Sequence, residues 1–386
     1  MTRGRKTLAV AAAVPATLLL TLVAGYDYVR GAVFVIQAAG MQGSARTVAE
    51  WTTTDLVESE TQIPTRSGYV RGRVYRPASP NGPATLLVPG VHAGGVDEPR
   101  LIQFARDVAS MGRIVVTAEL PDLKQYRITP RSTDIIEDAG LWLSEQSGYA
   151  PDRRIGMMGI SFAGGLSIVA GSRPSLRDRV AFVLSFGGHG DLPRTLRYLC
   201  TGVQPDGSVR PPHDYGIAII LLGVADRVVP PAQAPPLRAA ILAFLHASHV
   251  DMIDKAQGKV EFSRARDLAA KLDEPARTLM NHVNERDVVR LGPILLPHVE
   301  ALGDDTALSP VKAPVPPFPV YLLHGTDDNV IPAVESALLA DTLRARGAKV
   351  EQLATPLITH AEVDRSAAAR AIWDLVAFWA ALLDEN

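Results

Sequence analysis

Residues 156–165 read GMMGISFAGG, and this stretch decides the fold. The apolar segment before Ser161 is predicted to be a buried strand, and the segment after it a helix. Gly159 and Ala163 are small, as a sharp strand-to-helix turn requires, because bulky side chains there would collide with the neighbouring strand and helix. The N–H groups at the start of the helix would suit a developing oxyanion. An ordinary turn with Ser161 as helix N-cap is the alternative.

Apolar segments alternate with helical ones on both sides of this turn. ATLLVPG is a continuous apolar run stopped by Pro-Gly, as in a strand buried on both faces. PRLIQFARDVASMG carries apolar residues at the spacing of a helix that packs one face. The alternation predicts a mostly parallel sheet with helices on both faces. The expected strands cover 69–77, 84–90, 113–120, 154–161 and 180–188, and the expected helices 99–112, 134–146 and 162–172.

The C-terminal part supplies the partners that a nucleophilic serine needs. A serine hydroxyl is a weak nucleophile unless a histidine takes its proton and an acid orients that histidine. PVYLLHGTDDNVIP predicts a strand that ends in a loop with Asp327 and Asp328. A helix follows, and then a strand that ends at His360. The order Ser, Asp, His, each just after a strand, is characteristic of one fold.

On GISFAGG, LLHGTDDNVIP and ITHAEVD the chain resembles the α/β-hydrolase superfamily, in particular bacterial esterases and dienelactone-hydrolase-like members. Their acid loop reads like H-G-x-x-D-x-x-V-P, which places the acid at Asp328, with Ile331 where valine is usual. The similarity covers about residues 60–192 and 315–386. Ala163 departs from the G-x-S-x-G pattern, which makes the match less specific.

The resemblance implies a serine hydrolase that cleaves carboxylic esters without a cofactor. Ser161 is the expected nucleophile, His360 the base and Asp328 the acid that holds His360. The backbone N–H groups of Phe162 and of Val91, in PGVHAGG, are expected to form the oxyanion hole. An acyltransferase with the same triad and a catalytically silent, envelope-anchored binding module are the alternative functions.

Several other residues have competing interpretations. Asp226, in GVADRVVPP, imitates the acid loop, and it could serve His360 only if 217–223 were a core strand. The apolar run 217–223 is compatible with strand or helix. Asp327 is expected to be a solvated loop residue. His92 and His189 are expected to line the substrate pocket.

The chain divides into segments by composition and pattern. The stretch 193–314 loses the alternation and is mostly helical, with Pro-rich joints, so it is predicted to be a cap inserted into the hydrolase core. The predicted segments are 1–30, signal anchor or signal peptide; 31–55, connector; 56–192, first part of the core; 193–314, cap; and 315–386, second part of the core.

The N-terminus predicts a membrane association. Residues 7–25 carry no charge, and the run is about as long as a helix needs to be to span a bilayer. It follows the basic residues Arg3, Arg5 and Lys6. The positive-inside rule then places the catalytic domain outside the cytoplasm, on a single-pass anchor. A cleaved signal peptide, with secretion or a periplasmic location, is the alternative, since Val23 and Gly25 suit a cleavage site.

Composition excludes several other classes of function. The net charge of −2 gives no basic field for nucleic acid. The one cysteine, Cys200, rules out an internal disulfide, and no Cys/His cluster has zinc spacing. No nucleotide-binding motif accompanies a fitting strand and helix. His246, His249 and Asp251 are more typical of cap packing than of a metal site.

Overall fold

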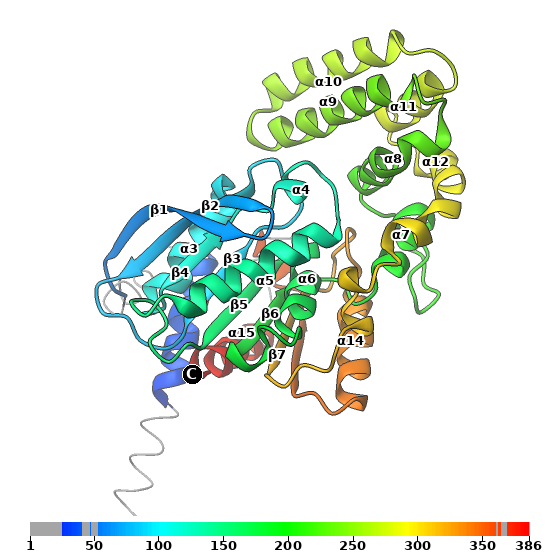
Figure 1. Ribbon diagram of the computed structural model, residues 1–386. Helices are drawn as coiled ribbons and strands as arrows, with labels where there is room; N and C mark the ends of the chain where they lie inside the picture. The colour runs from blue at the N-terminus through cyan, green and yellow to red at the C-terminus, as the bar shows by residue number, and fades with distance from the viewer. Residues whose placement is uncertain (1–24, 41–46, 48–52, 360–361, 364–368, 386) are drawn as a thin grey trace, which may run out of the picture.

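The computed structural model describes residues 25–40, 47, 53–359, 362–363 and 369–385. An 8-stranded sheet forms the centre, in the order β1-β2-β4-β3-β5-β6-β7-β8 (Figure 1). Strand β2 is antiparallel to both of its neighbours, and the pairs from β4 to β8 are parallel. The strands are β1 (Leu56–Thr65), β2 (Gly68–Pro77), β3 (Ala84–Val88), β4 (Val115–Ala118), β5 (Ile155–Ile160), β6 (Val180–Phe186), β7 (Val320–Gly325) and β8 (Val350–Thr355).

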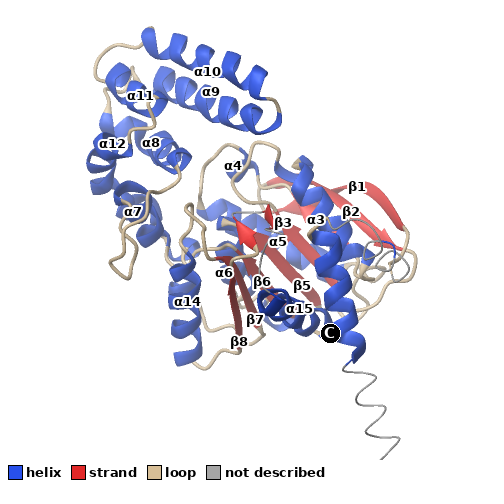
Figure 2. Cartoon of the chain, turned by 180° about the vertical axis from the view of Figure 1, so that it is seen from behind, coloured by secondary structure: helices blue, strands red, loops and turns tan. Residues whose placement is uncertain are grey.

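Helices cover both faces of the sheet. One face carries α3 (Pro99–Ser110) and α15 (Ala369–Asp384), and the other α5 (Pro130–Glu145), α6 (Phe162–Gly171) and α14 (Ala333–Ala345) (Figure 2). Neighbouring residues of β3 show the division, because Leu86 packs in the core with α5 and α6 and Leu87 in the core with α3 and α15. The architecture confirms the predicted α/β-hydrolase fold.

A further helix, over residues 25–38, packs on α15. The ring of Phe34 lies 4.0 Å from that of Trp379, measured between centroids. The contact is close at Gly31, where an added Cβ would stand 2.4 Å from a backbone oxygen of α15. Most of this helix falls in the segment 31–55 that the sequence suggested to be a connector, and its buried residues Val33, Phe34 and Val35 pack in the same core as α3 and α15.

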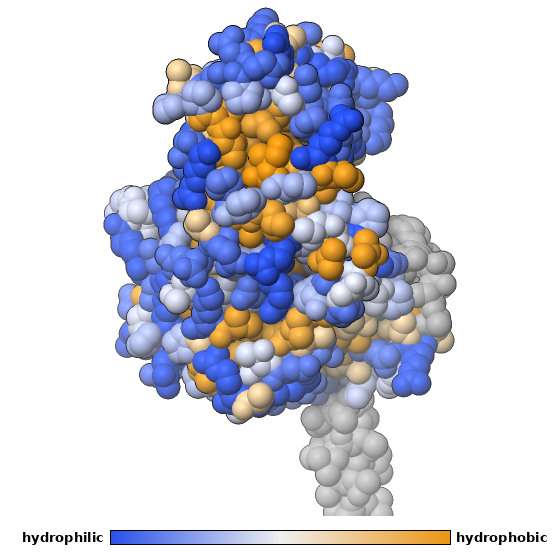
Figure 3. All heavy atoms as spheres, turned by 90° about the vertical axis from the view of Figure 1, so that its right-hand side faces the viewer, coloured by the Kyte–Doolittle hydropathy of each residue, from blue (hydrophilic) through white to orange (hydrophobic). Residues whose placement is uncertain are grey.

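The insertion between β6 and β7 is helical and stands beside one end of the sheet (Figure 1). Apolar side chains gather over it on the face shown in Figure 3. The run 217–223 lies inside α8, so it is helix and not a core strand. The helices are α7 (Leu192–Thr201), α8 (Asp214–Val228), α9 (Ala234–Ile253), α10 (Lys255–Ala270), α11 (Ala276–Asn284), α12 (Val288–Leu295) and α13 (Val299–Gly303).

The predicted anchor lies almost wholly outside the described residues, which begin at Gly25. Among the helices that the described residues form, none combines the length and the apolar character needed to span a bilayer.

Candidate active site

Ser161 occupies a strained turn between β5 and α6. Its backbone has φ 54° and ψ −133°, a conformation that L-residues rarely adopt. The strand ends at Ile160 and the helix begins at Phe162. A Cβ added at Gly159 would stand 2.3 Å from the backbone oxygen of Ala163, so only glycine fits there. The small residues around the serine therefore have the steric role that the sequence indicated.

The Ser161 side chain is buried at the wall of a cavity of about 750 Å³. No described residue forms a hydrogen bond with its Oγ. Its N–H donates to the carbonyl of Phe186 at 2.7 Å, which ties the turn to the end of β6. The helix that starts at the next residue leaves its first N–H groups without partners in the helix, as every α-helix does. These donors start at Phe162, one of the two expected oxyanion donors.

The loop after β3 lies directly against this serine. A Cβ built on Gly90 would stand 3.0 Å from the Cβ of Ser161. Val91, the other expected oxyanion donor, follows Gly90 and lines the same cavity. The two expected donors thus come from segments that meet at Ser161.

Asp328 is buried just beyond the end of β7, with 2% of its surface exposed. Its Oδ1 accepts hydrogen bonds from the N–H groups of Val330, at 2.8 Å, and Ile331, at 3.0 Å. Its Oδ2 lies 3.4 Å from Nε2 of His324 and 3.6 Å from where a Cβ of Gly187 would stand. Backbone donors of this kind stabilise a carboxylate in its charged form. Because β5 and β7 run in the same direction, Asp328, just after the end of β7, lies at the same edge of the sheet as Ser161, just after the end of β5.

The two competing acids have other surroundings. The Asp327 side chain is 73% exposed, and its Oδ1 accepts a hydrogen bond from Arg210 at 3.0 Å. Asp226 belongs to α8, is 57% exposed and pairs with Arg238. Asp327 follows β7 as Asp328 does, but neither competing carboxylate is buried, so Asp328 is the one of these three that is enclosed at the edge that holds Ser161.

His360, the expected base, lies outside the described residues. The described chain comes close to it on both sides, where β9 (Ile358–Thr359) pairs with β10 (Glu362–Val363). Ile358 lines the cavity that contains Ser161. The chain therefore reaches the cavity wall two residues before His360.

His92 and His189 differ in position. His92 lines the cavity, accepts a hydrogen bond on Nδ1 from the N–H of Gly94 at 3.1 Å, and contacts the His249 ring edge-on. Burial lowers the pKa of His92 to about 4, although the nearby Glu98 acts in the opposite direction. It is therefore neutral at physiological pH.

His189 is fully buried and is not among the described residues that line the cavity. Its Nε2 lies 2.7 Å from the carbonyl oxygen of Leu308. The sequence suggested His189 as a pocket residue; its ring packs against α6, where Gly165 leaves room for it: an added Cβ there would stand 2.7 Å from the ring.

Three parts of the chain surround the cavity. The core contributes the loop after β3 and the turn at Ser161, and the insertion contributes residues of α8, α9 and α10. The third part is the helix 25–38, through Phe34, Val35 and Ala38, together with Leu375 and Trp379 of α15. This wall was not predicted from the sequence, although the i, i+4 spacing of Phe34 and Ala38 is compatible with one buried helix face.

The described cavity wall carries two arginines and four carboxylates, those of Glu98, Asp107, Asp214 and Asp251. Arg286 lies 2.9 Å from Asp214, and Arg100 lies 2.7 Å from Glu98. Both arginines on the described wall thus have carboxylate partners, and burial lowers the pKa of His249, which favours its neutral form. This arrangement suits an uncharged ligand better than an anion.

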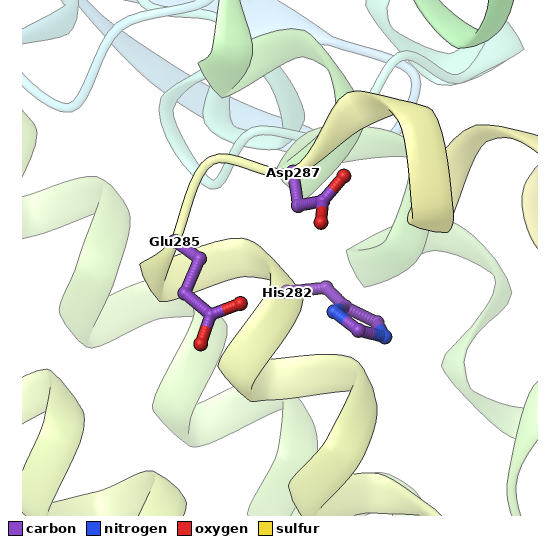
Figure 4. A group of neighbouring side chains, drawn as sticks. All are labelled: His282, Glu285 and Asp287. Carbon is purple, nitrogen blue, oxygen red and sulfur yellow. The ribbon is translucent and has the colours of Figure 1, made fainter.

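One group of side chains could hold a metal ion. His282, Glu285 and Asp287 meet at the turn between α11 and α12, with ligand atoms within 4.8 Å of one another (Figure 4). Asp287 already caps α12, where its Oδ1 accepts a hydrogen bond from the N–H of Arg290 at 2.9 Å. None of the three lines the cavity.

Comparison with known proteins gives structural likenesses only. No protein-family model matches the sequence, and no curated protein sequence matches it. An esterase of the archaeon Pyrobaculum calidifontis is 16% identical over 94% of this chain and 93% of its own, with a TM-score of 0.46. Carboxyl esterase 2 of the fungus Tuber melanosporum is 15% identical over 86% and 87%, with a TM-score of 0.49. A thermophilic carboxylesterase cloned from a metagenomic library is 17% identical over 88% and 92%, with a TM-score of 0.45.

Proposed function

We propose that this protein is a serine hydrolase that cleaves uncharged carboxylic esters through an acyl-enzyme intermediate. The observation that carries the proposal is the position of Ser161, at a positive-φ turn between β5 and α6 and on the wall of a cavity of about 750 Å³. Such a turn projects a serine hydroxyl from the edge of the sheet. The pairing of both described wall arginines with carboxylates disfavours an anionic substrate.

In the proposed reaction the Oγ of Ser161 attacks the ester carbonyl carbon while His360 accepts the hydroxyl proton. The N–H groups of Phe162 and Val91 donate to the oxyanion of the tetrahedral intermediate. His360 then returns the proton to the leaving alkoxide, which departs as the alcohol. Water attacks the acyl-enzyme by the same route, so that the acid is released and Ser161 regains its proton.

Asp328 is proposed to orient His360 and to stabilise the imidazolium that forms in each step. Two features support this role: the burial of its carboxylate and its place at the same sheet edge as Ser161. Ile358, on the cavity wall, is two residues from His360, and an extended chain covers at most about 7 Å in two residues.

The proposal is tested by steady-state hydrolysis of p-nitrophenyl esters of increasing acyl length. The wild type is compared with Ser161→Ala and with Ser167→Ala as matched control. Ser167 is also buried, lies in α6, and its Oγ has no hydrogen-bond partner among the described residues. Activity should be lost in Ser161→Ala and kept in Ser167→Ala. Equal activity in all three proteins would refute the assignment.

We also propose that residues 7–25 hold the protein in a membrane, with the catalytic domain on the extracytoplasmic side. The uncharged run behind Arg3, Arg5 and Lys6 supports this location. Cell fractionation should find the full-length chain in membranes, released by detergent and not by high salt. A mature N-terminus near Tyr26 would instead establish signal cleavage.

A further inference from the structure

An exposed apolar surface lies where the helix 25–38 meets α15. We call it the aromatic patch; its residues are Tyr26, Tyr28, Val29, Ile372 and Trp373, whose exposed fractions lie between 39% and 61%.

 The rings of Tyr28 and Trp373 stack in parallel, with centroids 5.1 Å apart. Stacked aromatic rings at the surface form a broad apolar face with polar edges.

The patch is held rigidly by the core beneath it. The rings of Phe34 and Trp379 pack against each other at a tilt, one or two helical turns further along the same two helices, and both are buried. The Arg30 guanidinium donates a hydrogen bond to the carbonyl of Leu383 at 3.3 Å, which ties the helix 25–38 to the end of α15. The patch is therefore a fixed surface of the folded domain.

We propose that the aromatic patch lies in the interface of the membrane that residues 7–25 enter. The patch begins at Tyr26, the residue that directly follows this uncharged run, and Val29 lies about 6 Å along the helix from Gly25, the last residue of the run. Tyrosine and tryptophan are enriched at the headgroup level of bilayers because one part of each ring is apolar and the other polar. The proposal rests on the proposed membrane location and is independent of the chemistry at Ser161.

The position of the patch relates the cavity to the membrane. Phe34 follows Tyr28 by six residues, and Trp379 follows Trp373 by six, which is about 9 Å along each helix. Both Phe34 and Trp379 line the cavity. A domain seated on the patch would therefore hold this cavity wall close to the lipid interface.

The test places a fluorescent NBD label in the patch of the full-length chain. Trp373→Cys supplies the labelling site, and Tyr69→Cys, on β2, is the matched control, since Tyr69 is an aromatic residue with 73% exposure. The natural Cys200 is buried, which raises the pKa of its thiol to about 12, so it stays unlabelled in the folded protein. Both proteins are reconstituted into phosphatidylcholine vesicles that carry lipid spin-labelled near the glycerol.

We expect the spin-labelled lipid to quench the label at position 373 at least about twofold more than the label at position 69, as for a side chain at headgroup level. Aqueous iodide should quench the two labels in the opposite order. Equal quenching at both positions would overturn the proposal. Protection of position 373 from iodide without quenching by lipid would also overturn it, because that is the result for a patch covered by a second copy of the chain. A chain that does not stay with the vesicles would overturn it as well. Ester hydrolysis enters none of these measurements, so the proposed function stands or falls separately.

Discussion

Gly90 faces Ser161 at the strand-to-helix turn and leaves no room for a side chain between them. A Cβ built on Gly90 would stand 3.0 Å from the Cβ of Ser161 and 3.1 Å from the carbonyl oxygen of Ile160. Glycine therefore lets the loop after β3 approach the serine, and with it the N–H of Val91. The spacing between the proposed nucleophile and one of its oxyanion donors therefore depends on glycine at position 90.

Gly90→Ala should displace the loop by a few tenths of an ångström and lower kcat about tenfold, equal to about 1.4 kcal/mol of transition-state stabilisation. KM should change less, because the donor acts mainly on the transition state. Gly148→Ala is the matched control, since nothing lies within 4 Å of an added Cβ there. Ester hydrolysis kinetics measure both. An unchanged kcat in folded Gly90→Ala would remove Val91 from the oxyanion hole.

Asp328→Asn should lower kcat by at least about 10²-fold, because the amide cannot stabilise the imidazolium or the productive tautomer of His360. Asp327→Asn and Asp226→Asn should each change kcat by less than about tenfold, the scale of a peripheral effect. All three variants replace a carboxylate by an amide of the same shape, so each controls for the others. The acid would be reassigned if Asp226→Asn were the most damaging change.

The pH profile of kcat/KM should fall as the pH drops below about 6 to 7, where an unperturbed imidazole becomes protonated and cannot act as base. His92 cannot cause this limb, because its pKa of about 4 keeps it neutral there. The profile should therefore keep its position in His92→Asn. A profile that stays flat to pH 5 in the wild type would point to a base other than His360.

His92 should also make the protein less stable in mild acid. Its pKa is about 4 in the folded protein, where burial disfavours the charged form, and about 6.5 in an unfolded chain. Between these values the unfolded chain binds a proton that the folded protein does not, so the free energy of unfolding falls as the pH falls from about 6.5 to 4. His92→Asn should reduce this loss.

Urea unfolding at pH 7.5 and at pH 5 gives the loss of unfolding free energy between the two pH values for each protein. The effect of His92 is the difference between this loss in the wild type and in His92→Asn. His246→Asn, a change at an exposed histidine of α9, is the matched control. If His92→Asn left the loss between the two pH values as large as in the wild type, burial of His92 would not be its source.

The sequence was sufficient for the features that depend on local pattern. The strand, serine and helix around Ser161 are adjacent in the chain, and the alternation of apolar and helical segments predicts the parallel part of the sheet. The strand β1 was not predicted, because most of its residues are exposed and it therefore lacks the alternation of a half-buried strand. The run 217–223 was ambiguous because α8 is buried almost all round.

Features that depend on distant partners could not be predicted. The helix 25–38 is fixed by Trp379, more than 340 residues away, and by the close approach that Gly31 permits. Its part in the cavity wall follows from that packing. The direction of His189 likewise depends on Gly165 and Leu308, which the sequence around His189 does not reveal.

The central claim is that Ser161 is an activated nucleophile, and a fluorophosphonate probe tests it most directly, because the probe forms a covalent bond only with a serine that its surroundings activate. The full-length wild type should react once per chain, and mass spectrometry of the digested protein should find the adduct on Ser161. Ser161→Ala should not react, and Ser167→Ala should react as the wild type does. A folded wild-type protein that does not react, or an adduct on another serine, would contradict the account.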